Sequence, residues 1–155
     1  MPYRNNITQL LERAGAAFLK SANAGVTLFV PEEIFEGITI LPLKLKRVVL
    51  HCAKATADTQ FEGNWNGTFR IEVHSDVDEA KANGGSEDHH QRAGEIFSKF
   101  MTDTIAADLS AAQAEFTAQQ VVPTEQGWGI DPEARAWFSY LQLEVNCCGK
   151  DIDMS

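Results

Sequence analysis

Apolar residues near the start of the chain recur at the spacing of an amphipathic helix. Asn5 or Asn6 stands just before the first of them and is of the residue type that caps a helix N-terminus. Gly25 follows the last apolar position and can end the element shortly after Ala22. We therefore predict a first helix with a buried stripe of Ile7, Leu10, Leu11, Ala14 and Phe18.

The segment that follows has the residue types of strands. Residues 26–30 form a short apolar run with β-branched members, closed by Pro31, which predicts a strand. We expect a turn and a short extended piece at residues 38–41, before Pro42. Another strand is predicted over residues 46–53. Its buried face would consist of Val48, Leu50 and Cys52.

Strict alternation of apolar and polar residues is clearest over residues 65–74. It favours an antiparallel strand with one buried face and one face in water. Residues 137–147 alternate in the same way, but Phe138 and Tyr140 fall on the more polar face of that strand. An apolar run at 116–122, closed by a proline, predicts a further strand.

A second amphipathic helix is predicted after the acidic stretch 75–88. Ser86 is its candidate N-cap, and Glu95 and Lys99 form an i,i+4 pair on its outer face. One continuous helical stripe consists of Ala93, Ile96, Phe97, Phe100, Met101, Ile105 and Leu109.

Strands cluster before and after this helix instead of alternating with helices. That order predicts an α+β fold with an antiparallel sheet of about four to six strands. The N-terminal helix and one long helix would pack on one face of the sheet. We expect residues 1–150 to form a single domain and residues 151–155 a flexible tail.

The net charge of −9 limits the classes of partner that the chain can bind. A surface this negative disfavours tight binding to nucleic acid or to an anionic membrane. A loose lumen through which DNA slides would still tolerate it. The chain lacks a run of about 18 apolar residues, so no membrane-spanning helix is predicted.

The residues most suited to chemistry lie around the acidic stretch. Carboxylates and imidazoles can hold a divalent metal, and His74, Asp76, His89 and His90 would serve a metal-assisted hydrolase. Adjacent histidines point about 100° apart on a helix, however, so the spacing matches neither a calcium loop nor a helical zinc pair, and a solvated loop that leads into a helix is favoured. The other candidates are Asp78, Glu79, Glu87 and Asp88.

No other constellation predicts catalysis or a cofactor. The three cysteines are odd in number, which argues against a disulfide framework and favours buried thiols in a reducing compartment. No phosphate-binding or dinucleotide-binding motif is present. An alternative is a small-molecule-binding module whose apolar pocket is lined by Phe69, Ile71, Val73, Phe97, Met101 and Leu141. The competing interpretation is that these residues simply fill the core.

Several residues are better suited to contact another protein. Trp128 stands between two glycines in a predicted loop, and tryptophan is enriched at interface hot spots. Aromatic residues on a wet strand face imply that a second layer or a neighbouring subunit covers it. The candidate interface residues are Trp128, Phe138, Tyr140, Arg70, Glu72 and Glu144.

One arrangement extends over about two thirds of the chain, from Lys46 to Lys150. A strand at 47–52 precedes the alternating strand 64–75, a helix that opens at His89-His90, and a closing strand with Trp137 and Val145-Asn-Cys147. This arrangement resembles tail-completion proteins of the tail-terminator type from tailed bacteriophages and prophages.

The resemblance implies a non-enzymatic virion protein that is made in the host cytoplasm. Such a subunit would close into a ring, often a hexamer, on the end of the tail tube. Its partners would be the tail tube and head-connector proteins, with DNA only passing through the lumen. The long acidic stretch and the His89-His90 doublet depart from that pattern.

Overall fold

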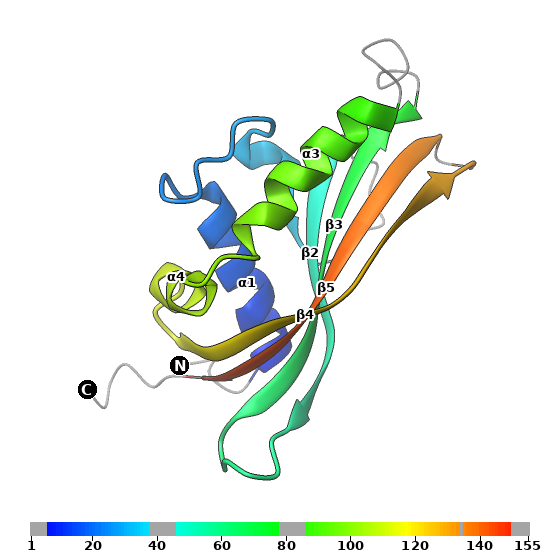
Figure 1. Ribbon diagram of the computed structural model, residues 1–155. Coiled ribbons are helices and arrows are strands. Elements are labelled where there is room, and N and C mark those ends of the chain that lie inside the picture. Colours follow the sequence, from blue (N-terminus) through cyan, green and yellow to red (C-terminus); the bar gives the residue numbers. More distant parts are fainter. Residues whose placement is uncertain (1–5, 38–45, 78–85, 134, 150–155) are drawn as a thin grey trace.

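The structure is a computed structural model that describes residues 6–37, 46–77, 86–133 and 135–149. It has two layers, a five-stranded sheet and the helices packed on one side of it (Figure 1). Strand order is β1-β2-β3-β5-β4, and only the short β1 runs parallel to its neighbour. The predicted α+β class is therefore confirmed.

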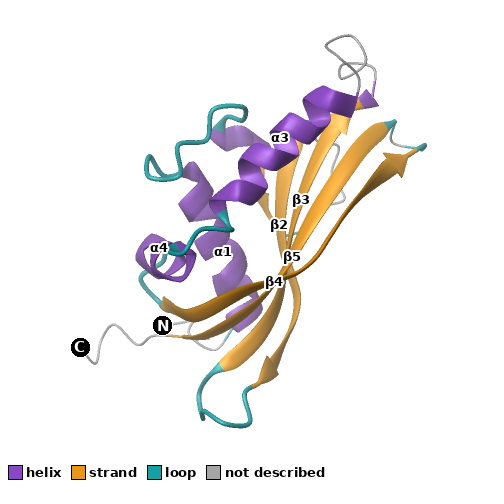
Figure 2. Cartoon of the chain, in the orientation of Figure 1, coloured by secondary structure: helices purple, strands orange, loops and turns teal. Residues whose placement is uncertain are grey.

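Figure 2 colours the helices and the strands differently. The elements are α1 (Ile7–Lys20), a 3-10 turn (Pro31–Glu33), β1 (Ile34–Glu36), β2 (Arg47–Ala57), β3 (Trp65–Asp76), α3 (Ser86–Lys99), α4 (Ile105–Ala112), β4 (Phe116–Asp131) and β5 (Ala136–Gly149). None of the described helices is long and apolar enough to cross a membrane.

The centre of the sheet is the antiparallel pair of β3 and β5. Their register is uninterrupted from Trp65 opposite Cys147 to Asp76 opposite Ala136. Burial alternates along β3 as the sequence predicts, with Phe69, Ile71 and Val73 fully buried under the helices. Full burial of such a side chain contributes about 1.5–3 kcal/mol, so this pair supplies much of the core.

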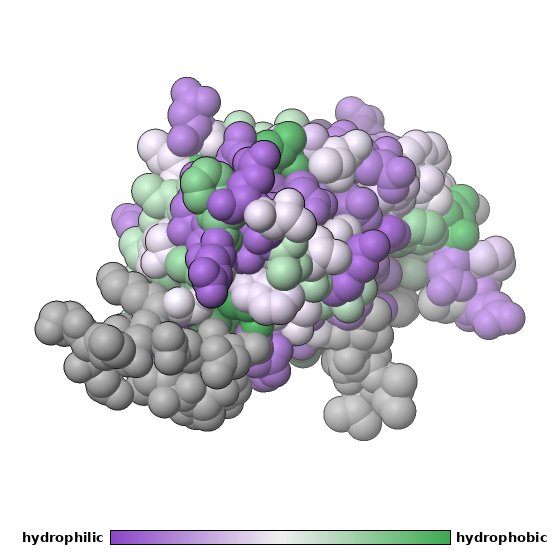
Figure 3. All heavy atoms as spheres, turned by 90° about the horizontal axis from the view of Figure 1, so that it is seen from below, coloured by the Kyte–Doolittle hydropathy of each residue, from purple (hydrophilic) through white to green (hydrophobic). Residues whose placement is uncertain are grey.

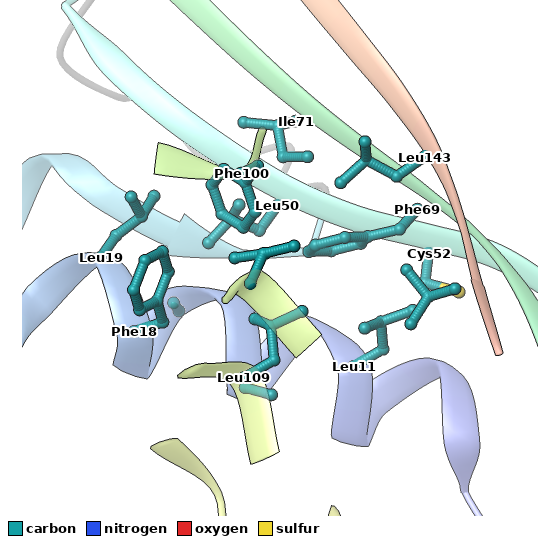
Figure 4. Packing of buried hydrophobic residues seen from close by; sticks show 14 of the residues in the cluster. Leu11, Phe18, Leu19, Leu50, Cys52, Phe69, Ile71, Phe100, Leu109 and Leu143 are labelled. Carbon is teal, nitrogen blue, oxygen red and sulfur yellow. The ribbon is translucent and has the colours of Figure 1, made fainter. Parts of the chain in front are cut away.

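Helix α1 crosses the sheet at unusually close range. Asn6 caps its first turn, and Leu10, Leu11 and Ala14 have no exposed surface. The Phe69 ring lies so close beneath Gly15 that a Cβ there would stand 2.6 Å from Cζ of Phe69. Figure 4 shows how Phe69 and its neighbours from the sheet and the helices fill the interior.

The prediction of a strand at residues 26–30 is wrong. These residues form a loop beside α3, and two of their backbone amides donate to a side chain instead of to a neighbouring strand. The amide groups of Thr27 and Leu28 donate to the Glu95 carboxylate at 3.0 and 2.9 Å. Burial would raise the pKa of Glu95, but these hydrogen bonds outweigh it and lower the pKa.

The predicted single long helix is two helices, α3 and α4, separated by a turn. Polar residues at 102–104 provide the start of α4, where the Thr104 hydroxyl donates to Asp108 Oδ2 at 3.0 Å. Both helices turn their apolar sides to the same core, so Ile105 and Leu109 remain buried and the helical spacing of apolar residues is unbroken in the sequence. Met101, which falls in the turn, is 52% exposed.

The strand predicted at 116–122 also differs, because β4 continues through Pro123 and the Gly127-Trp128-Gly129 segment to Asp131. The predicted loop at 127–129 is therefore wrong. β4 is an edge strand, where proline can be accommodated, and its register shifts between Pro123 and Glu125. The extended piece expected at 38–41 and the tail at 151–155 lie outside the described residues.

We predict that Gly15→Ala lowers the free energy of unfolding by about 1–2 kcal/mol, although alanine is the better helix former. The new methyl group would meet the fully buried ring of Phe69. Urea denaturation measures the change.

The matched control is Gly94→Ala in α3, where an added Cβ has no neighbour within 4 Å. This substitution should raise the free energy of unfolding by about 0.5–1 kcal/mol. Equal effects of the two substitutions would contradict the close approach of α1.

Candidate functional site

One face of the sheet carries none of the described helices, which all lie on the other side (Figure 1). We call it the open face. Five of the six candidate interface residues project from neighbouring positions of β3 and β5 on this face. They are Arg70, Glu72, Phe138, Tyr140 and Glu144. Trp128 is the exception, because its register opposite Ser139 places it on the helix side of the sheet.

Charged side chains along β3 form a connected row on the open face. Arg70 Nε lies 2.9 Å from Glu72 Oε2, and His74 Nε2 lies 3.0 Å from Glu72 Oε1. The hydrogen bond from His74 does most to lower the pKa of Glu72, against the opposing effect of burial. Glu72 therefore stays ionised, and the row presents fixed charges instead of flexible ones.

Aromatic side chains of β5 cover two glycines of the edge strand. A Cβ on Gly127 would come within 2.7 Å of the Tyr140 ring, and one on Gly129 within 3.1 Å of Phe138. Rings that lie over edge glycines stabilise a sheet. The Arg70 guanidinium lies 3.9 Å from the centroid of Tyr140. A hydrogen bond to Glu125 is the main cause that raises the pKa of the Tyr140 hydroxyl.

A groove runs between α3 and the edge strand β4 on the helix side. It has a volume of about 460 Å³, and Phe97, Met101 and Trp128 supply its apolar walls. Trp128 is 55% exposed, and its ring lies 4.8 Å from that of His90 and 5.9 Å from that of Trp137. We call this the edge groove. The exposed tryptophan expected from the sequence is therefore present, but on a strand and not in a loop.

His89, a candidate metal ligand in the sequence analysis, is instead buried between α3 and the sheet. It has no exposed surface, its Nδ1 lies 2.9 Å from Ser75 Oγ, and its Nε2 lies 2.8 Å from Ser139 Oγ. Burial is the main cause that lowers the pKa of His89 to about 4. The ring is therefore neutral at pH 7, with one nitrogen donating and the other accepting. Both serines fall on the buried faces of alternating strands. This spacing was the signal in the sequence that a buried polar partner is needed.

The structure does not bring the metal-binding candidates together. His74 contacts Glu72 on the open face, whereas His89 is buried on the helix side of the same sheet. Within residues 6–37, 46–77, 86–133 and 135–149, no three His, Cys, Asp or Glu side chains are placed to hold a metal ion. Asp78 and Glu79 lie outside the described residues.

The residues of the predicted apolar pocket do not surround a common cavity. Phe69, Ile71, Val73 and Leu141 have no exposed surface and belong to the packed core, whereas Met101 lies on the surface. Of that set, only Phe97 and Met101 line the edge groove. The interpretation that the residues of this set fill the core is therefore confirmed for Phe69, Ile71, Val73 and Leu141.

Two of the three cysteines expected in the core are found there. Cys52 and Cys147 are buried, and burial is the main cause that raises the pKa of each thiol to about 12. Both are therefore protonated at neutral pH and poorly suited to act as nucleophiles. Cys148 is half-buried.

Figure 3 views the molecule from below. On the described surface in this view, hydrophobic residues form no single large patch. The described surface there alternates between hydrophilic and hydrophobic residues. The exposed large hydrophobic residues of the chain instead include a local set on and beside the far half of β4. This set consists of Met101, Trp128 and Ile130.

The buried histidine makes the stability of the chain dependent on pH. Because the pKa of His89 is lower in the folded chain than in the unfolded chain, the unfolded state binds more protons between pH 6.5 and about 4. We predict that the free energy of unfolding falls as the pH drops through that window. Urea denaturation at pH 7.5 and pH 5 measures the fall.

In His89→Ala the chain should be less stable at pH 7.5 by about 1–3 kcal/mol, because two buried hydroxyls lose their partner. The fall between pH 7.5 and pH 5 should also be smaller. His90→Ala removes an exposed ring that contributes to lowering the pKa of His89 but leaves the buried histidine and both serine contacts in place, so it should reduce the slope less than His89→Ala does. A His89→Ala chain with the full pH dependence would show that this histidine does not cause it.

A search against models of known protein families finds no match for this chain, and a search against curated protein sequences finds none either. A function for this chain must therefore be argued from the open face, the edge groove and the resemblance in element order.

Proposed function

We propose that this chain is a structural subunit that assembles head to tail into a closed ring, as a tail-completion protein at the end of a bacteriophage tail tube. As the resemblance implies, the ring would be a hexamer. Its surfaces would meet the tail tube on one side and the head connector on the other.

The observation that carries the proposal is the open face. A five-stranded sheet buries one side beneath helices and leaves on the other a fixed row of charges beside two half-buried aromatic rings. Interfaces between proteins combine aromatic residues and arginine at their centre with a polar rim. Arg70, stacked on Tyr140 and paired with Glu72, provides this combination.

A closed ring requires two different patches on each subunit, because its interfaces are heterologous. The open face and the edge groove meet this requirement, since they lie on opposite sides of the sheet and share the β4–β5 edge. A standard interface buries about 800 Å² on each partner, roughly a tenth of the 8433 Å² surface of this chain. Two such patches fit on the molecule without overlap.

The negative charge is compatible with the same role. With a formal net charge of −9, the subunit would not hold a DNA backbone that has to slide through the lumen. Opposite charges within the row on β3 also mean that the open face is not uniformly repulsive toward a second copy.

The proposal predicts that charge reversal on the open face and truncation in the edge groove each weaken assembly. Arg70→Glu removes the contacts to Tyr140 and Glu72, and Trp128→Ala removes the exposed ring of the groove. Each should lower the oligomeric fraction at least tenfold in sedimentation velocity, with purified tail tubes added where the free chain is monomeric.

Two variants serve as controls. Lys20→Glu makes the same charge change at an exposed position of α1 on the helix side of the sheet, and Phe61→Ala truncates an exposed aromatic residue that is not part of the groove. Both should assemble like the parent chain. A parent chain that stays monomeric and ignores tube ends would refute the ring, and loss of assembly in either control would refute the assignment of its surfaces.

A further inference from the structure

A polar pocket lies at the end of the molecule where the β2–β3 hairpin projects beyond the rest of the chain (Figure 1). Its volume is about 680 Å³, which is within the range of small-ligand sites. We call it the hairpin pocket. Its walls are unusually rich in side-chain amides and consist of Ala57, Asp58, Thr59, Gln60, Phe61, Asn64, Asn66, Gln119, Gln120 and Asn146.

The floor of the hairpin pocket is a fixed hydrogen-bond network around Asn146. Its Nδ2 donates to Asp58 Oδ2 at 2.9 Å and to Asn66 Oδ1 at 2.8 Å. Its Oδ1 accepts a hydrogen bond from Asn64 Nδ2 at 3.1 Å. Asp58 also accepts from the backbone of Gln60 at 2.8 Å, so the turn and the sheet hold one another in place. The hydrogen bond from Gln60, with that from Asn146, lowers the pKa of Asp58 and keeps it ionised.

Among the described residues, this network leaves part of the hydrogen-bonding capacity of the amides that line the pocket unused. Asn66 Nδ2 and Asn64 Oδ1 are the unused halves of two amides that the network orients. The side-chain amides of Gln60 and Gln120 make no hydrogen bond to any residue that the structure describes. A ligand for this pocket must therefore offer donors and acceptors side by side.

Phe61 adds an apolar platform at the rim. It is 62% exposed, the most exposed of the large hydrophobic residues that the structure describes. The pocket walls hold no described lysine or arginine, and their one charge is the carboxylate of Asp58. An anionic ligand would thus be repelled, whereas a neutral ligand with one apolar face would be accepted.

We propose that the hairpin pocket binds a neutral saccharide. Vicinal hydroxyl groups of a sugar donate and accept at neighbouring positions, which matches the paired groups of the amides. The C–H face of a pyranose ring would stack on Phe61. Asn146 is six residues from Tyr140 along β5, about 20 Å, so the pocket is separate from the aromatic centre of the open face and the inference does not depend on ring assembly.

The test uses the full chain and a glycan array that carries neutral, sialylated and sulfated oligosaccharides, followed by titration of the best neutral ligand by NMR. We expect neutral glycans to bind with dissociation constants in the micromolar to millimolar range. Side-chain amide resonances of Asn64, Asn66 and Gln120 should shift on titration.

Phe61→Ala and Gln120→Ala should each weaken binding at least tenfold and leave the denaturation curve unchanged, because both side chains are exposed. Leu28→Ala, which truncates another exposed hydrophobic residue outside the pocket, should bind like the parent chain. The proposal is overturned by an array with no neutral ligand at 10 mM, by preference for anionic glycans, or by unchanged affinity in both pocket variants.

Discussion

The contact between α1 and the centre of the sheet is the constraint on which the other features depend. The Phe69 ring occupies the space that a side chain at residue 15 would need, so the helix axis lies close to β3 and covers one face only. With α3 and α4 packed on the same side, the chain has one core and the opposite face of β3 and β5 is left without a helix. One-sided burial thus creates the surface that the proposed function uses.

The two strands with strict alternation could be predicted because their signal is local. In β3 the buried and half-buried positions follow the sequence pattern from Asn66 to Asp76, since neighbouring residues face opposite sides of the pleat. The N-cap of α1 at Asn6 was visible for the same reason. The break between α3 and α4 was not, because the helical spacing of apolar residues continues when two helices share a core.

Other features depend on residues far apart in the sequence and could not be predicted from local patterns. Residues 26–30 have strand-like composition, but the amide groups of Thr27 and Leu28 donate to Glu95, at least 67 residues away in the sequence. The buried position of His89 depends on two serines from different strands. Five interface candidates could be assigned to the open face, because period-two spacing fixes which side of a strand each residue faces. The register of β4, which places Trp128 on the helix side, could not be predicted in this way.

The rings that lie over the edge glycines have a consequence for how this sequence can change. Any residue larger than glycine at position 127 would collide with Tyr140, so a replacement there demands a smaller side chain at position 140. Gly129 and Phe138 constrain one another in the same way. Relatives of this chain should therefore vary at these positions in pairs, and a relative that keeps both aromatic rings should keep both glycines.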